Sequence, residues 1–187
     1  GADIPENPVM KQFWGKVPVA AAMAYCHFSK GGKMQRLIHH LKYKNRPDIG
    51  VKMGQLCAHQ LHGATMYSTA HVVVPVPLHP NKQRLRGYNQ AASFGQGLAQ
   101  VLRIPHLENA LQRRKNTSTQ TRKSRFERSQ NVSSVFEVQD MKALEGKNII
   151  LVDDVITTGS TLVSAAEELV RIPGVRVSIV TIAFARG

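Results

Sequence analysis

The order of apolar and polar positions predicts an α/β chain with an irregular start. Residues 1–16 hold two prolines and show no clear period, so we expect an N-terminal arm over residues 1–30. Apolar side chains recur three to four positions apart over residues 34–41, and a related pattern runs through residues 51–61. This spacing is typical of helices with one buried face. A small helical region is therefore expected near the N-terminus.

Short apolar runs further along predict buried strands. Residues 71–78 form a β-branched, apolar run, which is typical of a strand covered on both faces in a parallel sheet. Its prolines indicate that the strand ends at about Val74 or Val76. Further strands are expected at residues 132–138, 148–153 and 175–184.

Helical patterns separate these strands. Residues 88–102 and 159–171 carry small and apolar side chains along one face. Strand, helix and strand in that order over residues 148–184 make a βαβ unit, so the sheet should be largely parallel. We predict an α/β fold with about five strands flanked by helices, in one domain over residues 31–187. A polar, basic gap at residues 112–131 is too long for an ordinary connection, and such loops are usually functional lids or disordered.

The composition agrees with a folded, reduced domain. The chain has 187 residues, 42% of them hydrophobic, and a domain of this size buries roughly 70% of the unfolded chain's surface. Cys26 and Cys57 are too few for a disulfide framework and lack zinc-site spacing, so a cytoplasmic location is expected. No apolar run approaches the roughly 20 residues of a membrane span. Residues 17–26 have a faint similarity to a signal peptide, but Pro18 interrupts them.

Positive charge is concentrated in three acid-poor segments. The chain has 25 basic and 12 acidic residues, a net charge of +13. The clusters lie at residues 30–46, 82–86 and 113–128. They favour nucleic acid, a membrane surface or a multiply phosphorylated small molecule as a partner, with a merely solvated surface as the alternative. The basic helix face that includes Lys42 is open to three interpretations: a site for an acceptor substrate, a surface for a partner or DNA, or a solvated face.

The clearest chemical signal lies at residues 148–161. An apolar strand brings Asp153 and Asp154 to its carboxyl end, the edge of an open α/β sheet where ligands bind. The next turn consists of Thr157, Thr158, Gly159, Ser160 and Thr161. Hydroxyls and free N–H groups at a helix start make a phosphate cradle, and two carboxylates beside it call for sugar hydroxyls or a divalent cation. The segment therefore points to a sugar phosphate; an ordinary capped helix start is the alternative.

This segment is similar to the ribose-phosphate signature of type I phosphoribosyltransferases, with four hydrophobic residues, two acids and T-T-G-x-T. Other motifs resemble the ComF family of these proteins. They are P-V-P-L-H at residues 75–79, R-x-R-G-Y-N-Q at 84–90 and R-x-K-x-T-x-x-Q at 113–120. The resemblance covers roughly residues 25–187 and implies the type I phosphoribosyltransferase fold. Many ComF-like proteins carry an N-terminal zinc finger that this sequence lacks, so zinc is not inferred.

The resemblance implies 5-phosphoribosyl-1-pyrophosphate (PRPP) with Mg²⁺ as the ligand. Asp153 and Asp154 would then contact the ribose 2′- and 3′-hydroxyls and serve Mg²⁺ mainly through the ligand, while residues 157–161 hold the 5′-phosphate. The pyrophosphate would bind at Leu78, His79, Arg84 and Arg86.

A basic hood over about residues 109–138 is implied to close over PRPP. Transfer at the anomeric carbon passes through an oxocarbenium-like state as pyrophosphate leaves, so a closing basic loop would stabilise the departing charge and exclude water. Lys115 and Arg128 in this hood join Asp153 and Asp154 as the catalytic candidates.

The implied function is Mg²⁺-dependent PRPP binding with phosphoribosyl transfer to an unidentified base or amine, in a protein linked to competence and DNA uptake. The alternative is a non-catalytic PRPP sensor or a competence factor that handles single-stranded DNA. A homodimer or a protein of the competence machinery are further possible partners. No feature of the sequence names the acceptor.

Overall fold

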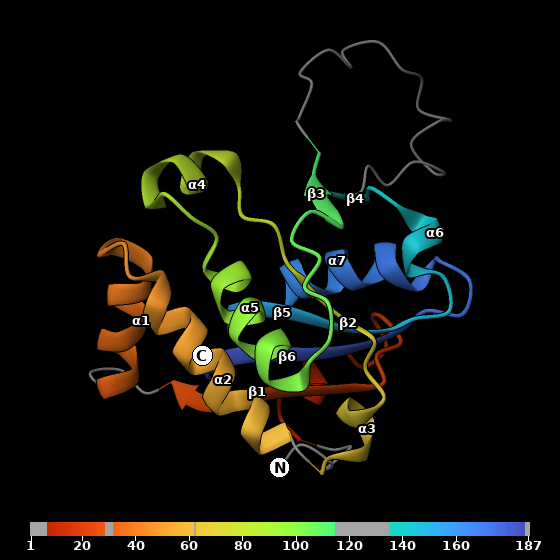
Figure 1. The fold of residues 1–187 in the computed structure, drawn as a ribbon, viewed down its shortest axis with the longest axis horizontal. Helices are drawn as coiled ribbons and strands as arrows, with labels where there is room; N and C mark the ends of the chain where they lie inside the picture. The colour runs from red at the N-terminus through yellow and green to blue at the C-terminus, as the bar shows by residue number, and fades with distance from the viewer. Residues whose placement is uncertain (1–6, 29–31, 62, 115–134, 186–187) are drawn as a thin grey trace.

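A parallel four-stranded sheet forms the centre of the molecule (Figure 1). The computed structural model describes residues 7–28, 32–61, 63–114 and 135–185. The sheet order is β1 (Ala21–Phe28), β6 (Arg176–Ala185), β5 (Asn148–Ile156) and β2 (Val72–Pro75). Every neighbouring pair is parallel. A second, two-stranded antiparallel sheet pairs β3 (Leu111–Arg113) with β4 (Phe136–Val138).

Helices cover both faces of the main sheet. They are η1 (Met10–Gln12, a 3₁₀-helix), α1 (Lys33–Tyr43), α2 (Pro47–Leu61), α3 (Thr65–Ser68), α4 (Pro80–Arg86), α5 (Gln90–Leu102), α6 (Met141–Leu144) and α7 (Ser160–Val170). In Figure 1, α2 and α5 lie together near the sheet, and the β3–β4 pair extends beyond α7. Within the described ranges, none of the helices is long and apolar enough to cross a membrane.

The alternation of side chains along the strands divides the core into two layers. Val72 and Val74 of β2 pack in the layer that includes α7 and the β3–β4 pair. Val73, between them, packs in the layer of α2 and α5, with Phe94 and Leu98. Because both faces are covered, the strands appear as continuous apolar runs in the sequence.

The helices α2 and α5 approach backbone to backbone. A Cβ atom added to Gly97 would lie 1.9 Å from the carbonyl oxygen of Val51, and one added to Gly54 would lie 2.1 Å from that of Phe94. Only glycine permits this approach. The pair forms a platform that fixes the start of α5 beside the carboxyl end of the sheet.

The structure confirms the predicted α/β class, with two differences in the main sheet. Its described part has four strands rather than about five; at the open edge of β2, only a single bridge joins His106 to Val73. The other difference lies within the expected arm, where residues 21–28 form β1. Alanine-rich residues after Pro18 give a weak strand signal, and the residues of β6 that pair with them lie 157 positions away in the sequence. Pairing with β6, rather than a local sequence pattern, therefore determines that residues 21–28 form a strand.

Short segments near the two ends of the expected hood pair with each other. Residues 111–113 and 136–138 pair as β3 and β4, and Phe136 is fully buried against the core. The predicted strand at 132–138 is observed from Phe136 onward, and residues 115–134 lie outside the described residues.

Candidate functional site

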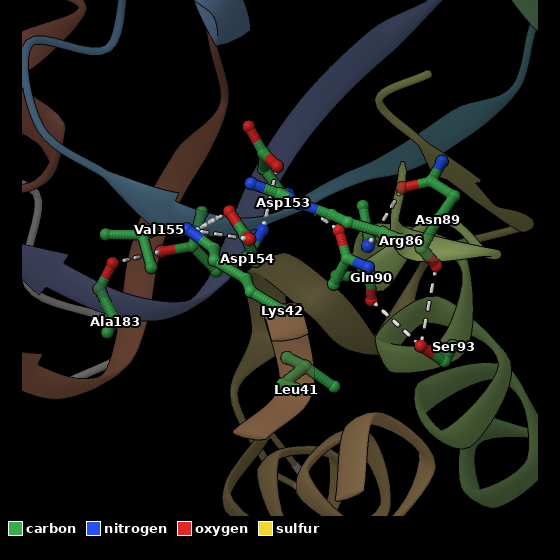
Figure 2. Close-up of polar contacts among 12 residues, drawn as sticks. Leu41, Lys42, Arg86, Asn89, Gln90, Ser93, Asp153, Asp154, Val155 and Ala183 are labelled. Atoms are coloured by element: carbon green, nitrogen blue, oxygen red, sulfur yellow. Dashed lines mark hydrogen bonds and ion pairs between the residues drawn. The ribbon is translucent and has the colours of Figure 1, made fainter. Parts of the chain in front are cut away.

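The acidic pair lies near the carboxyl end of β5, as predicted (Figure 2). The carboxylate of Asp153 accepts a hydrogen bond from the backbone N–H of Asp154 at 2.8 Å. The carboxylate of Asp154 accepts one from the backbone N–H of Val155 at 2.6 Å. Both side chains are partly buried. These local bonds hold the two carboxylates in fixed positions at the sheet edge.

The two carboxylates have different electrostatic environments. Burial, together with the neighbouring carboxylate of Asp154, raises the pKa of Asp153 to about 7. Asp154 instead pairs with Lys42 of α1, whose Nζ lies 3.1 Å from Asp154 Oδ2. The pair therefore carries less than two full negative charges near neutral pH, which eases the approach of an anionic ligand.

The turn at residues 157–161 leads directly into α7. Gly159 has a left-handed backbone, with φ of 75°, and precedes the first helical residue. The hydroxyls of Thr158 and Ser160 lie 3.3 Å apart. Residues 155–162 and Asp153 line a hollow of about 40 Å³. Its hydroxyls and the N–H groups at the start of α7 suit a phosphate group.

A larger cavity of about 300 Å³ opens beside the acidic pair. Its lining residues come from six separate parts of the fold. They are Lys42; Val76, Pro77, Leu78 and His79; Lys82 and Arg86; Asn89, Gln90 and Ala91; Arg113; and Asp153, Asp154, Val155 and Thr161. Asp153, Val155 and Thr161 also line the small hollow. The acidic pair thus lies where a phosphate-sized hollow meets a cation-rich cavity.

The structure places the four predicted pyrophosphate residues in different settings. Leu78, His79 and Arg86 line the larger cavity, whereas Arg84 lies exposed on α4 and does not line it. His79 caps α4, since its Nδ1 accepts a hydrogen bond from the backbone N–H of Asn81 at 3.2 Å. This cap gives His79 a structural role at the mouth of the cavity.

Arg86 is oriented by neighbours from two elements. Its Nη1 donates to the side-chain oxygen of Gln90 at 2.8 Å, and its guanidinium carbon lies 5.6 Å from the ring centre of Tyr43. Its buried Nε has no hydrogen-bond partner among the described residues. A guanidinium that lines the cavity and is fixed in this way suits a phosphate oxygen.

Arg113 and Asn89 also line the larger cavity, although the sequence pointed to them only as members of longer motifs, at residues 113–120 and 84–90. The Arg113 guanidinium carbon lies 4.9 Å from the ring centre of Phe136, and burial lowers its pKa while Asp153 opposes that effect. The amide of Asn89 donates to the carbonyl of Val76 at 3.0 Å and accepts from the backbone N–H of Ala91 at 3.1 Å. Asn89 thereby joins the loop after β2 to the start of α5. Arg113 opened a motif in the sequence, which is the signal that could have identified it.

Lys42 is the other functional residue without a sequence-based assignment, because the basic face of its helix offered several equivalent candidates. The proposed catalytic residues Lys115 and Arg128 lie outside the described residues.

The acidic pair fits Mg²⁺ only with help from a ligand. No cluster of three or more His, Cys, Asp or Glu side chains able to hold a metal occurs in the described part of the chain. Mg²⁺ is commonly held by one or two carboxylates together with substrate phosphates and water. Asp153 and Asp154 match that donor set.

The fold and the family match define a phosphoribosyltransferase-type domain. The chain belongs to the phosphoribosyl transferase domain family, whose model matches residues 89–187. Two solved structures share the fold with TM-scores of 0.50, and each aligns over 75% of this chain. They are the allosteric regulatory enzyme of purine biosynthesis (22% identical, 29% of that chain covered) and the glutamine phosphoribosylpyrophosphate amidotransferase of Bacillus subtilis (23% identical, 30% covered). The predicted type I phosphoribosyltransferase fold is therefore confirmed.

Relatives with competence-related names confirm the ComF resemblance. The chain is 45% identical to competence protein F of Haemophilus influenzae over 91 residues, 48% of this chain and 40% of that protein. It is 32% identical to DNA utilization protein YhgH of Escherichia coli over 138 residues, 72% of this chain and 60% of the relative. Competence protein ComFC of Bacillus subtilis is 36% identical over 54% of this chain and 39% of its own length. The chain spans at most 60% of the length of these relatives.

Proposed function

We propose that this protein binds PRPP together with Mg²⁺ and transfers the phosphoribosyl group to a base or an amine. One observation carries the proposal: Asp153 lines both the small hollow formed by residues 155–162 and the cation-rich cavity. A ribose with a phosphate at one end and a pyrophosphate at the other matches this order of hydroxyl-rich hollow, carboxylates and cations.

Each part of the site has a role in this proposal. Residues 157–161 bind the 5′-phosphate, and the carboxylates of Asp153 and Asp154 accept hydrogen bonds from the ribose hydroxyls. The pyrophosphate binds along Leu78 and His79, with Lys82, Arg86 and Arg113 as its cations. We assign the role once expected of Arg84 to these lining residues, because Arg84 lies outside the cavity lining.

The chemistry of transfer follows from the charges. The bond from the anomeric carbon to pyrophosphate breaks, the acceptor nitrogen forms the new bond, and the nitrogen loses a proton to the departing pyrophosphate or to water. The leaving group gains negative charge, which Arg86 and Lys82 stabilise, while the ring gains positive charge, which the acidic pair favours. Bound Mg²⁺ neutralises charge on the pyrophosphate. Lys115 and Arg128 remain proposals for the hood that excludes water.

Calorimetry with PRPP tests the proposal directly. We expect saturable binding that strengthens with Mg²⁺, and loss of binding in the double variant Asp153→Asn, Asp154→Asn with its melting temperature retained. A matched control is Glu145→Gln with Glu167→Gln, which removes two carboxylates outside the cavity lining. Equal PRPP affinity in wild type and in the Asp153, Asp154 variant would overturn the assignment of the site.

The exposed basic face of α1 favours a second candidate function. Lys33 and Arg36 are exposed on this helix and Lys44 is exposed directly after it, together with Tyr43, whose exposed fraction is 58%. A non-catalytic PRPP sensor or a competence factor that handles single-stranded DNA would use such a surface. DNA bound through several phosphates weakens steeply as salt rises. Negligible DNA affinity at low salt would eliminate this candidate.

The relatives' names favour a link between this protein and the competence machinery. We propose a cytoplasmic location, with a second copy of the chain or a protein of the competence machinery as a partner. Size-exclusion chromatography with light scattering tests the homodimer, and a monomeric mass at high protein concentration would contradict it.

A further inference from the structure

Lys42 reaches the acidic pair from a helix that precedes the family-matched region. The matched region covers residues 89–187, whereas Lys42 lies in α1. Its Nζ lies 3.1 Å from Asp154 Oδ2, and the side chains of Lys42 and Asp154 are 22% and 14% exposed. Both line the larger cavity. Figure 2 shows Lys42 directed toward Asp154. The ion pair therefore faces the proposed ligand rather than bulk solvent.

The end of α1 is anchored on both sides of Lys42. The hydroxyl of Tyr88 donates a hydrogen bond to the backbone carbonyl of Leu41. The ring of Tyr43, the following residue, lies 5.6 Å from the guanidinium carbon of Arg86. Leu41 itself is almost fully buried, at 1% exposed. These contacts hold the backbone of Lys42 in place, so that its long side chain loses less freedom when it pairs with Asp154.

The charges of the cavity explain what Lys42 contributes. Four permanently basic side chains face two carboxylates in its lining: Lys42, Lys82, Arg86 and Arg113 against Asp153 and Asp154. Of these four, Lys42 forms an ion pair with the acidic pair. Without it, an unpaired carboxylate would face a ligand that carries several negative charges, and the interaction would be repulsive. A divalent cation could compensate for that loss.

We propose that Lys42 is the positioning residue that sets how strongly PRPP binding depends on Mg²⁺. This inference rests on the proposed function. The ammonium group holds the Asp154 carboxylate in the orientation that accepts a ribose hydroxyl. It also places a positive charge beside the two carboxylates, and this charge partly replaces the charge of Mg²⁺ bound with PRPP. Helix α1 thereby forms part of the PRPP site.

Calorimetric titration of PRPP against Mg²⁺ concentration, including a metal-free series with chelator, tests this role. The variant is Lys42→Met, which keeps the aliphatic stem and removes the charge. We expect its affinity to fall about tenfold at saturating Mg²⁺ and about a hundredfold without Mg²⁺, in line with the loss of a charged hydrogen bond. Lys42→Arg should restore most of the affinity. Lys52→Met removes the same charge from an exposed position on α2, outside the cavity lining, and should match wild type.

The outcomes separate this inference from the proposed function. If wild type binds PRPP and Lys42→Met binds with the same affinity and the same Mg²⁺ dependence, the role of Lys42 is overturned and the PRPP site stands. A uniform loss of affinity in Lys42→Met, independent of Mg²⁺, also overturns it, because a purely structural defect would act equally at every Mg²⁺ concentration. If folded wild type binds no PRPP, the proposed function fails, and this inference fails with it. Melting temperatures of each variant show that the comparison is made between folded proteins.

Discussion

Two walls of the candidate site are built in different ways. The phosphate wall, residues 153–161, is one continuous stretch from the end of β5 to the start of α7. The helical wall consists of Lys42 from α1 with Lys82 and Arg86 from α4. Local backbone geometry shapes the first wall, while the second requires α1, α4 and α5 to pack together. One part of a ligand site can thus be shaped by the local conformation of a single segment, while another part requires the tertiary packing of several helices.

The largest expected effect comes from breaking the platform beneath the helical wall. Gly97→Ala would place a Cβ atom 1.9 Å from the carbonyl oxygen of Val51, so α2 and α5 must move apart. We expect a loss of about 3 kcal/mol in the free energy of unfolding, typical of strong overpacking, measured by urea denaturation. Gln96→Ala, at an exposed position of the same helix, should change it little. Equal stability of the two variants would show that the platform tolerates separation of the helices.

A second variant breaks the phosphate wall and leaves the helical wall intact. Gly159→Ala forces alanine into a backbone with φ of 75°, which costs about 1–2 kcal/mol, although the nearest atom to the new Cβ lies at 3.4 Å. Because the turn would relax away from this conformation, PRPP affinity should fall together with stability. Calorimetry and urea denaturation measure the two quantities.

Gly15→Ala is the matched control for that change. Gly15 has φ of 69°, and a Cβ added there would meet no atom within 4 Å, so it carries a similar conformational penalty. It lies outside the linings of both cavities. We expect a similar loss of stability with PRPP affinity unchanged. A loss of affinity in Gly15→Ala equal to that in Gly159→Ala would mean that stability alone, rather than the turn, governs binding.

A milder change loosens the helical wall. Tyr88→Phe removes the hydrogen bond to the Leu41 carbonyl and so releases one anchor of α1. The free energy of unfolding should fall by about 1 kcal/mol, the usual net value of one hydrogen bond. The PRPP affinity should fall several-fold because Lys42 is less well placed, an effect measured by calorimetry. Tyr25→Phe, on β1, serves as the control, and equal affinities in the two variants would show that this anchor does not position Lys42.

The contrast between the two walls also explains which site residues could be predicted from the sequence. Residues 153–161 could be selected from the sequence because their apolar strand, adjacent acids and glycine are consecutive and each has a local physical meaning; their binding of phosphate stays a prediction. Lys42 was one of several basic residues on its helix, and only the packing of α1 against Tyr88 and Arg86 selects it. Arg84 and Arg86 were equivalent in the sequence, whereas the position of each on α4 puts only Arg86 in the cavity lining.

The fold, too, could be predicted from the sequence only where local patterns determine it. Helices and strands with a strong period were predicted at nearly their observed positions, because burial on one or both faces leaves a pattern in neighbouring residues. Strand β1 left little trace, since residues 21–24 are small or apolar without a distinctive period and its only strand partner among the described residues is β6. Long-range pairing of this kind is set by three-dimensional contacts. The roles of Lys115 and Arg128 remain predictions.

The smallest expected effect lies beneath both walls, at His106. Its Nε2 is buried without a hydrogen-bond partner among the described residues, and it would lie 3.0 Å from a Cβ added to Gly95 of α5. Burial lowers the pKa of His106, although Glu108 opposes the shift. The folded state therefore favours the neutral ring, so its contribution to stability is complete above the unfolded-state pKa of about 6.5 and declines as the pH falls through the lower folded-state pKa.

Melting temperatures between about pH 7 and pH 5 test this point, since histidine is the side chain that normally titrates there. Asp153, whose pKa burial raises to about 7, favours the folded state as the pH falls, whereas His106 opposes it. The melting temperature of wild type should therefore fall relative to that of His106→Gln toward the acidic end. His59→Gln, on the exposed surface of α2, should leave the pH profile of wild type unchanged. Because His106 lies beside β2 and α5, which support both walls, its effect should act on the scaffold as a whole. Parallel pH profiles of the melting temperature in wild type and His106→Gln would show that His106 does not contribute to the acid sensitivity.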